Sequence, residues 1–201
     1  KLIVLDPRKS ENAEAADVWL PLRAGTDTAM LLGWMNVIIE EELYDKDFVR
    51  DWTHGWEPFV ERVREYPLDR VSAITGVDAE LVAEAARIYA TQGPATIPWS
   101  PITDQQVSST SGTRLQCILR AICGHLDVEG GDTFVGFNPA VRADSEIEMH
   151  DLLSDEQKAK QLGADTHPAF TYRGMEALGD ATERVWGTRW ANLVGGCYMA
   201  N

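Results

Sequence analysis

Short apolar runs alternate with helical patterns along the first hundred residues of the chain. Residues 2–5 and 18–20 are continuous apolar runs, and a third short run of Ala-Thr-Ile spans 95–97. Each run is closed by a nearby proline, and unbroken runs of this length are typical of strands buried on both faces of a parallel sheet. The pattern therefore predicts three neighbouring parallel strands.

Helical spacing of apolar residues predicts the elements between and after these strands. Ser10, Asp45 and Asp78 stand where they can cap helix N-termini, and Thr26 or Asp27 can cap the long helix that runs to about residue 43. Apolar residues cover most of that long helix, so it is expected to be largely buried. The predicted helices span about 11–16, 27–43, 46–52, 59–63, 71–74, 79–92 and 110–126.

Strands that alternate with helices are typical of an α/β domain with a parallel sheet. We interpret residues 1–136 as a Rossmann-like, three-layer (α/β/α) domain. The signal weakens after residue 131, and 141–168 is acidic with few apolar anchors. Residues 137–201 are therefore expected to be a less regular, truncated extension. The first and last residues of the chain are those expected for an internal segment of a longer protein.

Charge and cysteine content exclude several classes of protein. The chain has 201 residues with 18 Lys and Arg against 32 Asp and Glu, a formal net charge of −14. An excess of acid without clustered cations is unsuited to a nucleic-acid backbone or an anionic membrane surface. No apolar run is long enough to span a bilayer. Three cysteines without C-x-x-C spacing fit a reducing, cytoplasmic compartment rather than a disulfide framework or a zinc site.

Three loops follow the predicted strands at the edge where parallel sheets bind ligands. The candidate binding residues are Asp6, Pro7, Arg8, Lys9 and Ser10 in the first loop, Gly25, Thr26 and Asp27 in the second, and Pro101 and Gln105 in the third. A carboxylate can accept two N–H bonds from guanine or bind ribose hydroxyls, and Arg and Lys can bind phosphate. From spacing alone, turns and helix caps explain the same residues, so nucleotide binding remains one of two interpretations.

The remaining candidates for chemistry are weaker. Neither G-x-G-x-x-G nor G-x-x-x-x-G-K-[ST] is present, and no Ser–His–Asp or paired-carboxylate arrangement stands out. The four histidines are far apart in sequence and are expected to be structural or solvent-facing. Cys117 and Cys123 lie on the predicted 110–126 helix, where a packing role is expected. No catalytic residue and no metal ligand is therefore assigned.

Taken together, motifs in these loops and helices resemble the dimethyl sulfoxide reductase family of molybdenum and tungsten enzymes. The match covers about residues 1–136 and is carried by the segments KLIVLDPR (1–8), AD (16–17), LRAGTD (22–27), LYDKDFV (43–49), ITGV (74–77), LRAICGHL (119–126) and GG (130–131). Within the family, the sequence is most similar to the acetylene hydratase branch at residues 17–23, 65–69, 97–99 and 116–122. Residues 127–132 are closer to the family's oxidoreductases.

The resemblance implies a cofactor and a role for each loop. Members bind two molybdopterin guanine dinucleotides with molybdenum or tungsten, and the first two loops would hold the guanosine end of one of them. The third loop would approach a pterin, although the family usually has Gly at Ser100 and a bulky residue at Pro101. The iron–sulfur cysteines and the metal ligand precede this segment in the family. The 201-residue chain alone is therefore expected to be inactive.

The same resemblance implies partners and leaves the reaction open. The parent protein would be an oxidoreductase acting on a small-molecule substrate, with an acetylene hydratase-like lyase as the alternative. A non-catalytic nucleotide-binding module is the third interpretation. The remainder of the parent chain is the expected partner, with no nucleic acid and no membrane insertion. Location would be cytoplasmic, or periplasmic as in some members of the family.

Overall fold

The computed structural model describes residues 1–98, 100, 103, 105–133, 152–160, 166, 180–181 and 183–184. The chain forms two compact units, residues 1–135 and 136–201. In the second unit, the short helix α10 (Asp155–Lys158) begins at Ser154, which forms a capping box with Gln157. Most of the predicted irregular extension at 137–201 lies outside the described residues. The account below concerns the first unit.

The first two predicted strands form the sheet that the structure describes in the first unit. The strand β1 (Ile3–Leu5) pairs in parallel with β2 (Val18–Leu20), and Ile3 lies opposite Val18 in the register. The helix α1 (Glu11–Ala15) makes the crossover and starts at Ser10, whose side chain accepts a hydrogen bond from the amide of Ala13. The side chains of β1 are only half-buried, so the prediction of burial on both faces is wrong for this strand.

The prediction of a third strand at 95–97 is also wrong. The described residues form a two-stranded sheet, and 95–97 is not in it. The polar groups of 95–97 bind side chains rather than a neighbouring strand. The Thr96 hydroxyl and the Ile97 amide donate to the Asp132 carboxylate, and the Ile97 carbonyl accepts from the Arg120 guanidinium. A parallel sheet and a predominance of helices are thus established, whereas three full layers are not.

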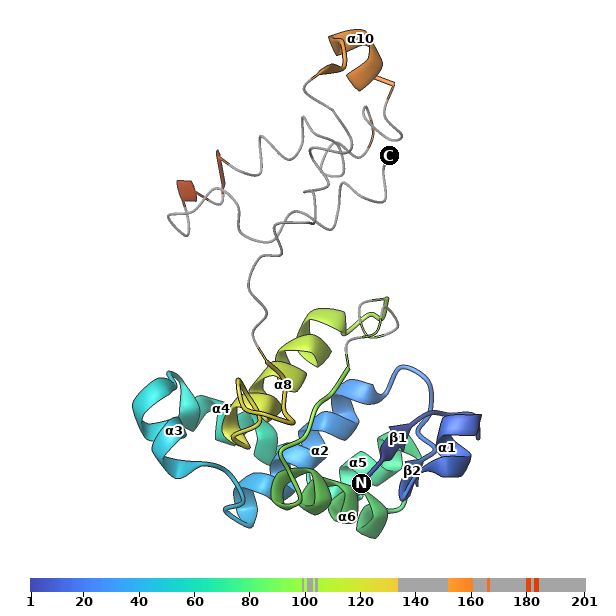
Figure 1. The fold of residues 1–201 in the computed structure, drawn as a ribbon, viewed down its shortest axis with the longest axis vertical. Helices are drawn as coiled ribbons and strands as arrows, with labels where there is room; N and C mark the ends of the chain where they lie inside the picture. The colour runs from blue at the N-terminus through green and yellow to red at the C-terminus, as the bar shows by residue number, and fades with distance from the viewer. Residues whose placement is uncertain are drawn as a thin grey trace. The chain divides into compact units, whose positions relative to one another are not determined.

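A single buried helix organises the core. In α2 (Asp27–Glu40), ten of the 14 residues are buried, as its apolar coverage predicts. Figure 1 shows α2 crossing the middle of the unit, and four helices pack against it: α4 (Trp56–Arg64), α5 (Leu68–Thr75), α6 (Ala79–Thr91) and α8 (Ser109–Ile122). The approach to α5 needs a glycine, because a Cβ at Gly33 would lie 2.8 Å from a methyl group of Val71.

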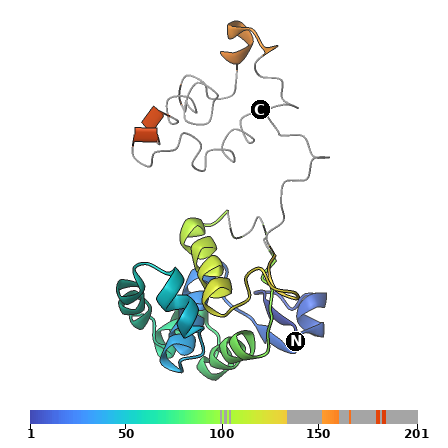
Figure 2. The same ribbon diagram turned by 60° about the vertical axis from the view of Figure 1, so that its left-hand side comes forward.

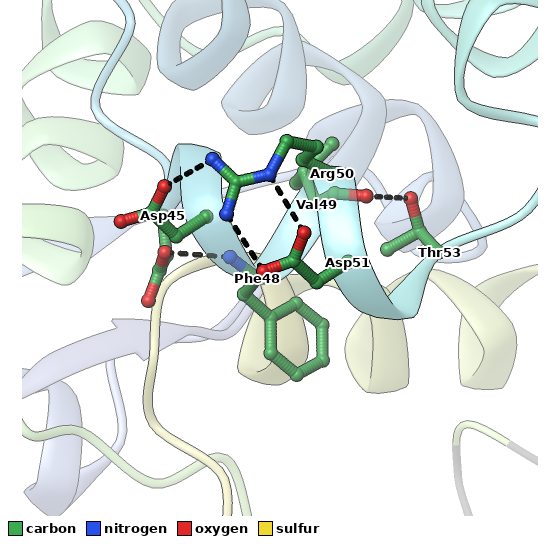
Figure 3. A network of polar contacts seen from close by, with 7 residues as sticks. Asp45, Phe48, Val49, Arg50, Asp51 and Thr53 are labelled. Atoms are coloured by element: carbon green, nitrogen blue, oxygen red, sulfur yellow. Dashed lines mark hydrogen bonds and ion pairs between the residues drawn. The ribbon is translucent and has the colours of Figure 1, made fainter.

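Local signals set several helix ends. Asp45 caps α3 (Lys46–Trp52) by accepting from the amide of Phe48 at 2.8 Å (Figure 3), and Asp78 caps α6 in the same way. The helix α8 ends at Ile122, four residues before the predicted position. Gly124 has a φ of +69°, and His125 donates its amide to the carbonyl of Arg120, which together form a Schellman C-cap.

The sheet and α1 lie on the side of the unit opposite α3 in both views (Figures 1 and 2). The loops that follow β1 and β2 therefore start next to each other, since parallel strands end at the same edge. Among the helices that the structure describes, none is long and apolar enough to cross a membrane.

Candidate functional site

The first loop is closed by its own carboxylate. Asp6 follows β1 and accepts a hydrogen bond from the amide of Arg8 at 2.8 Å. This bond and a second one from the Ser10 side chain lower the pKa of the Asp6 carboxyl below its ordinary value. The Asp6 carbonyl accepts from the indole N–H of Trp19 at 2.8 Å, which ties the loop to β2. Asp6 therefore shapes the loop, and Pro7 lies exposed in it.

Two cations stand on this closed loop outside the ion pairs of the described residues, although the charge of Arg8 also contributes to lowering the pKa of Asp6. Within the described residues, neither the Arg8 guanidinium nor the Lys9 ammonium forms an ion pair, and both line an open hollow of about 410 Å³. The Lys9 ammonium lies 5.9 Å from the centre of the Trp19 ring. Glu11 lines the same hollow. The two cations are therefore free to bind an anion.

Other cations of the chain are already engaged. Arg50 donates to the carboxylates of Asp47 and Asp51, both at 2.6 Å. Figure 3 shows the contact between Arg50 and Asp51. These side chains are exposed, so the pairs contribute little to stability. They do remove Arg50 from the cations available for a phosphate, which distinguishes it from Arg8 and Lys9.

The second loop is anchored on α5. Arg23 donates its amide to the carbonyl of Thr75, and its guanidinium donates to the carbonyls of Ala73 and Ile74 at 2.7 and 2.9 Å. These bonds satisfy carbonyls at the end of α5 that have no partner inside the helix. Gly25 has a φ of +80°, and no other group lies within 4 Å of where its Cβ would be. The backbone at Gly25 is therefore open to a ligand.

Neither Thr26 nor Asp27 caps α2 with its side chain. Thr26 occupies the N-cap position of α2, but its hydroxyl donates to the carbonyl of Arg23 at 2.6 Å and caps nothing. Asp27 is the first residue of the helix and is half-buried. Its carboxylate has no hydrogen-bond or ion-pair partner within the described part of the chain. The expectation that Thr26 or Asp27 caps the helix is therefore wrong.

The third loop meets the second at the start of α2. The Ser108 and Thr28 hydroxyls lie 2.9 Å apart, which joins the residue before α8 to the first turn of α2. Gln105 is exposed, three residues before this contact. Pro101 lies outside the described residues. The structure thus places Ser108, which follows the third loop, next to the residue after Asp27.

The ion pair between Arg120 and Asp132 was not predicted from the sequence. The Arg120 Nε donates to the Asp132 carboxylate at 2.6 Å, and their side chains are only 14% and 26% exposed. Burial opposes ionisation of Asp132, but hydrogen bonds from Thr96, Ile97 and Arg120 outweigh it and lower the pKa of this carboxyl. Arg120 lies on a helix and Asp132 on a later turn, twelve residues away. No helical or strand periodicity in the sequence relates two such residues, so the pair could not be predicted from spacing.

The cysteines differ from each other. Cys117 is exposed on α8, so the predicted packing role is wrong for it. Cys123 is half-buried at the end of α8, and burial raises the pKa of its thiol to about 12. A thiol that stays protonated at neutral pH is a poor nucleophile or metal ligand, and Cys123 is therefore structural.

Two of the four histidines lie in the described part of the chain. His125 is only 3% exposed, and its Nε2 lies 2.8 Å from the carbonyl of Tyr89 near the end of α6, which is a structural role. His54 is exposed. His150 and His167 lie outside the described residues. No group of three His, Cys, Asp or Glu that could hold a metal occurs among the residues that were searched, which are the described ones.

Comparison with known proteins places the chain in a family. No family model matches it. Acetylene hydratase of Syntrophotalea acetylenica is 51% identical over all 201 residues, which correspond to 27% of that protein. Formate dehydrogenase H of Escherichia coli is 35% identical over 189 residues, 93% of this chain and 24% of its own length. A molybdopterin-containing thiosulfate reductase subunit of Salmonella typhimurium is 32% identical over 133 residues, 65% of this chain and 17% of that subunit.

A solved structure agrees with these relatives. Acetylene hydratase from Pelobacter acetylenicus has a TM-score of 0.69 at 51% identity, covering 94% of this chain and 26% of that one. The chain therefore spans about a quarter of the length of the curated relatives with which it is most fully aligned. With acetylene hydratase, a formate dehydrogenase and a molybdopterin-containing reductase subunit as its relatives, this chain belongs to the dimethyl sulfoxide reductase family of molybdopterin oxidoreductases.

Proposed function

We propose that this chain is an internal domain of a molybdenum or tungsten enzyme with two molybdopterin guanine dinucleotides, and that it binds the guanosine end of one of them. The observation that carries the proposal is a set of charged side chains on neighbouring loops that form no ion pair within the described residues. Asp27 offers a free carboxylate at the start of α2, while Arg8 and Lys9 offer free cations on the loop after β1. A guanine nucleotide needs both kinds of charge.

The residues fit such a cofactor by their chemistry. One carboxylate can accept the N1–H and N2–H of guanine together, which suits Asp27. A guanidinium and an ammonium can bind the phosphates, which suits Arg8 and Lys9. The open backbone at Gly25 allows a nucleotide to approach closely, and the Ser10 and Thr26 side chains lie on the two loops that would hold it.

The third loop would contact the pterin through Pro101 and Gln105. Once bound, the cofactor supplies the molybdenum or tungsten centre, and the residues of this chain bind and orient it. We also propose that further strands of the parent protein complete a three-layer sheet with β1 and β2. The cysteine content favours a cytoplasmic location.

The reaction of the parent is either redox chemistry or hydration. Oxidoreductases are the majority of the relatives described above. Hydration is the alternative. It is supported by the 51% identity to acetylene hydratase over the whole chain, which exceeds the 35% identity to formate dehydrogenase H. Assay of the full-length parent for acetylene consumption and for formate oxidation separates the two.

The 201-residue chain by itself is expected to show no turnover. The resemblance locates the metal ligand and the iron–sulfur cysteines before this segment, and the proposed site covers only part of one cofactor. The measurement is hydration of acetylene, oxidation of formate and reduction of dimethyl sulfoxide by the purified chain. Turnover that survives further purification and scales with the amount of chain would contradict this expectation.

Removing the two free cations is expected to weaken binding of guanosine diphosphate to the chain. A charge-assisted hydrogen bond contributes about 1.5–3 kcal/mol, so the double variant Arg8→Gln/Lys9→Gln should bind at least about tenfold more weakly. Its affinity should also depend less on salt. Titration followed by NMR provides the affinity and shows whether the shifts fall in the first two loops.

The matched control is the double variant Lys46→Gln/Arg50→Gln. It removes the same net charge from side chains that already have acidic partners. We expect it to leave the affinity for guanosine diphosphate within about twofold of the wild type. An equal loss of affinity in both double variants would mean that net charge alone attracts the nucleotide, and the proposed phosphate site would be wrong.

A further inference from the structure

One arginine joins the second loop to the end of α5. The Arg23 amide donates to the carbonyl of Thr75 at 2.8 Å. The Arg23 guanidinium donates through Nη1 to the carbonyls of Ala73 and Ile74 at 2.7 and 2.9 Å. Three consecutive carbonyls in the last turn of α5 therefore bind a single residue of the second loop, through both its backbone and its side chain.

The end of α5 favours a cation that the helix itself does not supply. Its last turn contains no basic residue. Carbonyls without a partner inside the helix and the negative end of the helix dipole both attract a positively charged donor. Gly76 follows the helix with a φ of +78°, and a Cβ there would lie 3.2 Å from the guanidinium carbon of Arg23. The glycine thus turns the chain after α5 and leaves room for the arginine.

The carbonyl of the same arginine holds the loop itself. It accepts hydrogen bonds from the amide of Thr26 at 3.2 Å and from the Thr26 hydroxyl at 2.6 Å. These two bonds close a turn around Gly25, where the backbone is open to a ligand. Asp27 follows directly as the first residue of α2. Arg23 therefore connects α5 to the turn that carries the proposed guanosine contacts.

The helix behind this arginine belongs to the buried core. The helix α5 packs on α2 where a Cβ at Gly33 would lie 2.8 Å from a methyl group of Val71. Val71 and Thr75 are fully buried. The Thr75 hydroxyl donates to the carbonyl of Val71 at 2.8 Å and accepts from the amide of Val77 at 3.2 Å. A loop that is bound to this helix is therefore held in place before any ligand arrives.

We propose that Arg23 is a positioning residue that holds the turn of residues 23–26 in the conformation that binds guanosine, and that it does not itself bind phosphate. This inference rests on the proposed function, which assigns Gly25 and Asp27 to the guanosine end. The guanidinium is engaged by the carbonyls of α5. A loop that is ordered before binding loses less conformational entropy when the ligand arrives. Without the bonds to α5, that entropy is lost at binding and the affinity falls.

The test compares guanosine with guanosine diphosphate on the Arg23→Gln variant of the 201-residue chain. A positioning role predicts that both affinities fall by the same factor, about tenfold, because the phosphates take no part in it. The salt dependence of guanosine diphosphate binding should match that of the control variant below. Weaker binding of guanosine diphosphate alone, or a smaller salt dependence than in the control, would mean that Arg23 binds the phosphates, and the inference would be wrong.

The matched control is Arg70→Gln. Arg70 lies on α5, is exposed like Arg23, and also donates to a backbone carbonyl, that of Glu65 at 2.6 Å. The variant removes the same charge from the same helix end region without touching the second loop. Both affinities should therefore stay within about twofold of the wild type. An equal loss in Arg70→Gln and Arg23→Gln would overturn the positioning role.

Amide hydrogen exchange separates a displaced loop from a general loss of structure. In Arg23→Gln, the amides of residues 24–27 should exchange about tenfold faster, whereas those of α6 and α8 should exchange as in the wild type. Faster exchange throughout the chain would mean that Arg23 supports the whole fold, and would overturn the inference. If Arg23→Gln does not fold, Arg23→Lys replaces it. Lysine keeps the charge but not the planar group, and a common loss of a few-fold in both affinities is then expected.

The two proposals can fail separately. If the wild-type chain binds neither guanosine nor guanosine diphosphate, the proposed function is wrong and the positioning role is overturned with it. If the wild type binds both and the folded Arg23 variant binds them equally well, the guanosine site stands and the positioning role is wrong.

Discussion

Replacing Ile38 with alanine is expected to lower the free energy of unfolding of the chain by about 2–5 kcal/mol. Ile38 is fully buried in α2, the helix against which four others pack. Truncation there loses the transfer free energy of three methyl or methylene groups and leaves a cavity that the close-packed helices cannot fill. Urea denaturation of the 201-residue chain, followed by circular dichroism, measures the change.

Trp52→Ala is the control for this prediction. The Trp52 side chain is larger than that of Ile38 but is 79% exposed at the end of α3. Its removal should cost about 0.5 kcal/mol or less, because little surface is returned to water. Similar losses in the two variants would mean that α2 is not the centre of the core. Because Asp27 lies on the first turn of α2, the same burial also fixes the position of the candidate guanine ligand.

Local features of the fold could be predicted from the sequence because their causes are local. Ser10, Asp45 and Asp78 cap helices by binding amides two or three residues ahead, and a short window of sequence contains both partners. The parallel pair β1 and β2 also follows from neighbouring segments, since a short helix joins them and leaves few other arrangements.

The third strand was predicted wrongly because its partner is remote. Residues 95–97 have the composition of a strand, yet the groups that bind them come from Arg120 and Asp132. Nothing within 95–97 distinguishes a ladder with another strand from bonds to distant side chains. The same limitation hid the Arg120–Asp132 pair, because contacts between a helix and a later turn leave no periodic trace in the sequence.

The candidate loops were predicted from their position after the predicted strands, and the family motifs then gave each of them a role. Neither argument indicated which side chains would lack partners. Asp6 turned out to close its own loop, whereas Arg8 and Lys9 form no ion pair in the described part of the chain. Thr26 was a candidate cap, yet its hydroxyl binds the carbonyl of Arg23. Several groups compete for the hydrogen bond of each such side chain with similar strength, and the three-dimensional geometry decides which of them binds it.

Replacing Asp27 with asparagine is expected to weaken guanosine diphosphate binding by about 1–3 kcal/mol, or roughly 5- to 150-fold. The proposed contact is between one carboxylate and the N1–H and N2–H of guanine. Asparagine removes the charge and replaces one acceptor oxygen with an NH2 donor that faces an N–H of guanine. One of the two hydrogen bonds is therefore lost and the other weakens. Discrimination against adenosine diphosphate, which lacks this pair of donors, should fall toward unity.

The stability of the chain should barely change in this variant. Asp27 caps nothing, so the expected loss is limited to the interaction of its charge with the helix dipole, about 0.3–1 kcal/mol. Asp45→Asn is the matched control, because Asp45 does cap a helix and asparagine replaces it well in that role. The control should bind guanosine diphosphate as the wild type does. Equal nucleotide affinity and equal cofactor content in Asp27→Asn and wild type would exclude Asp27 as the guanine ligand, and with it the assignment of α2's first turn to the guanosine site.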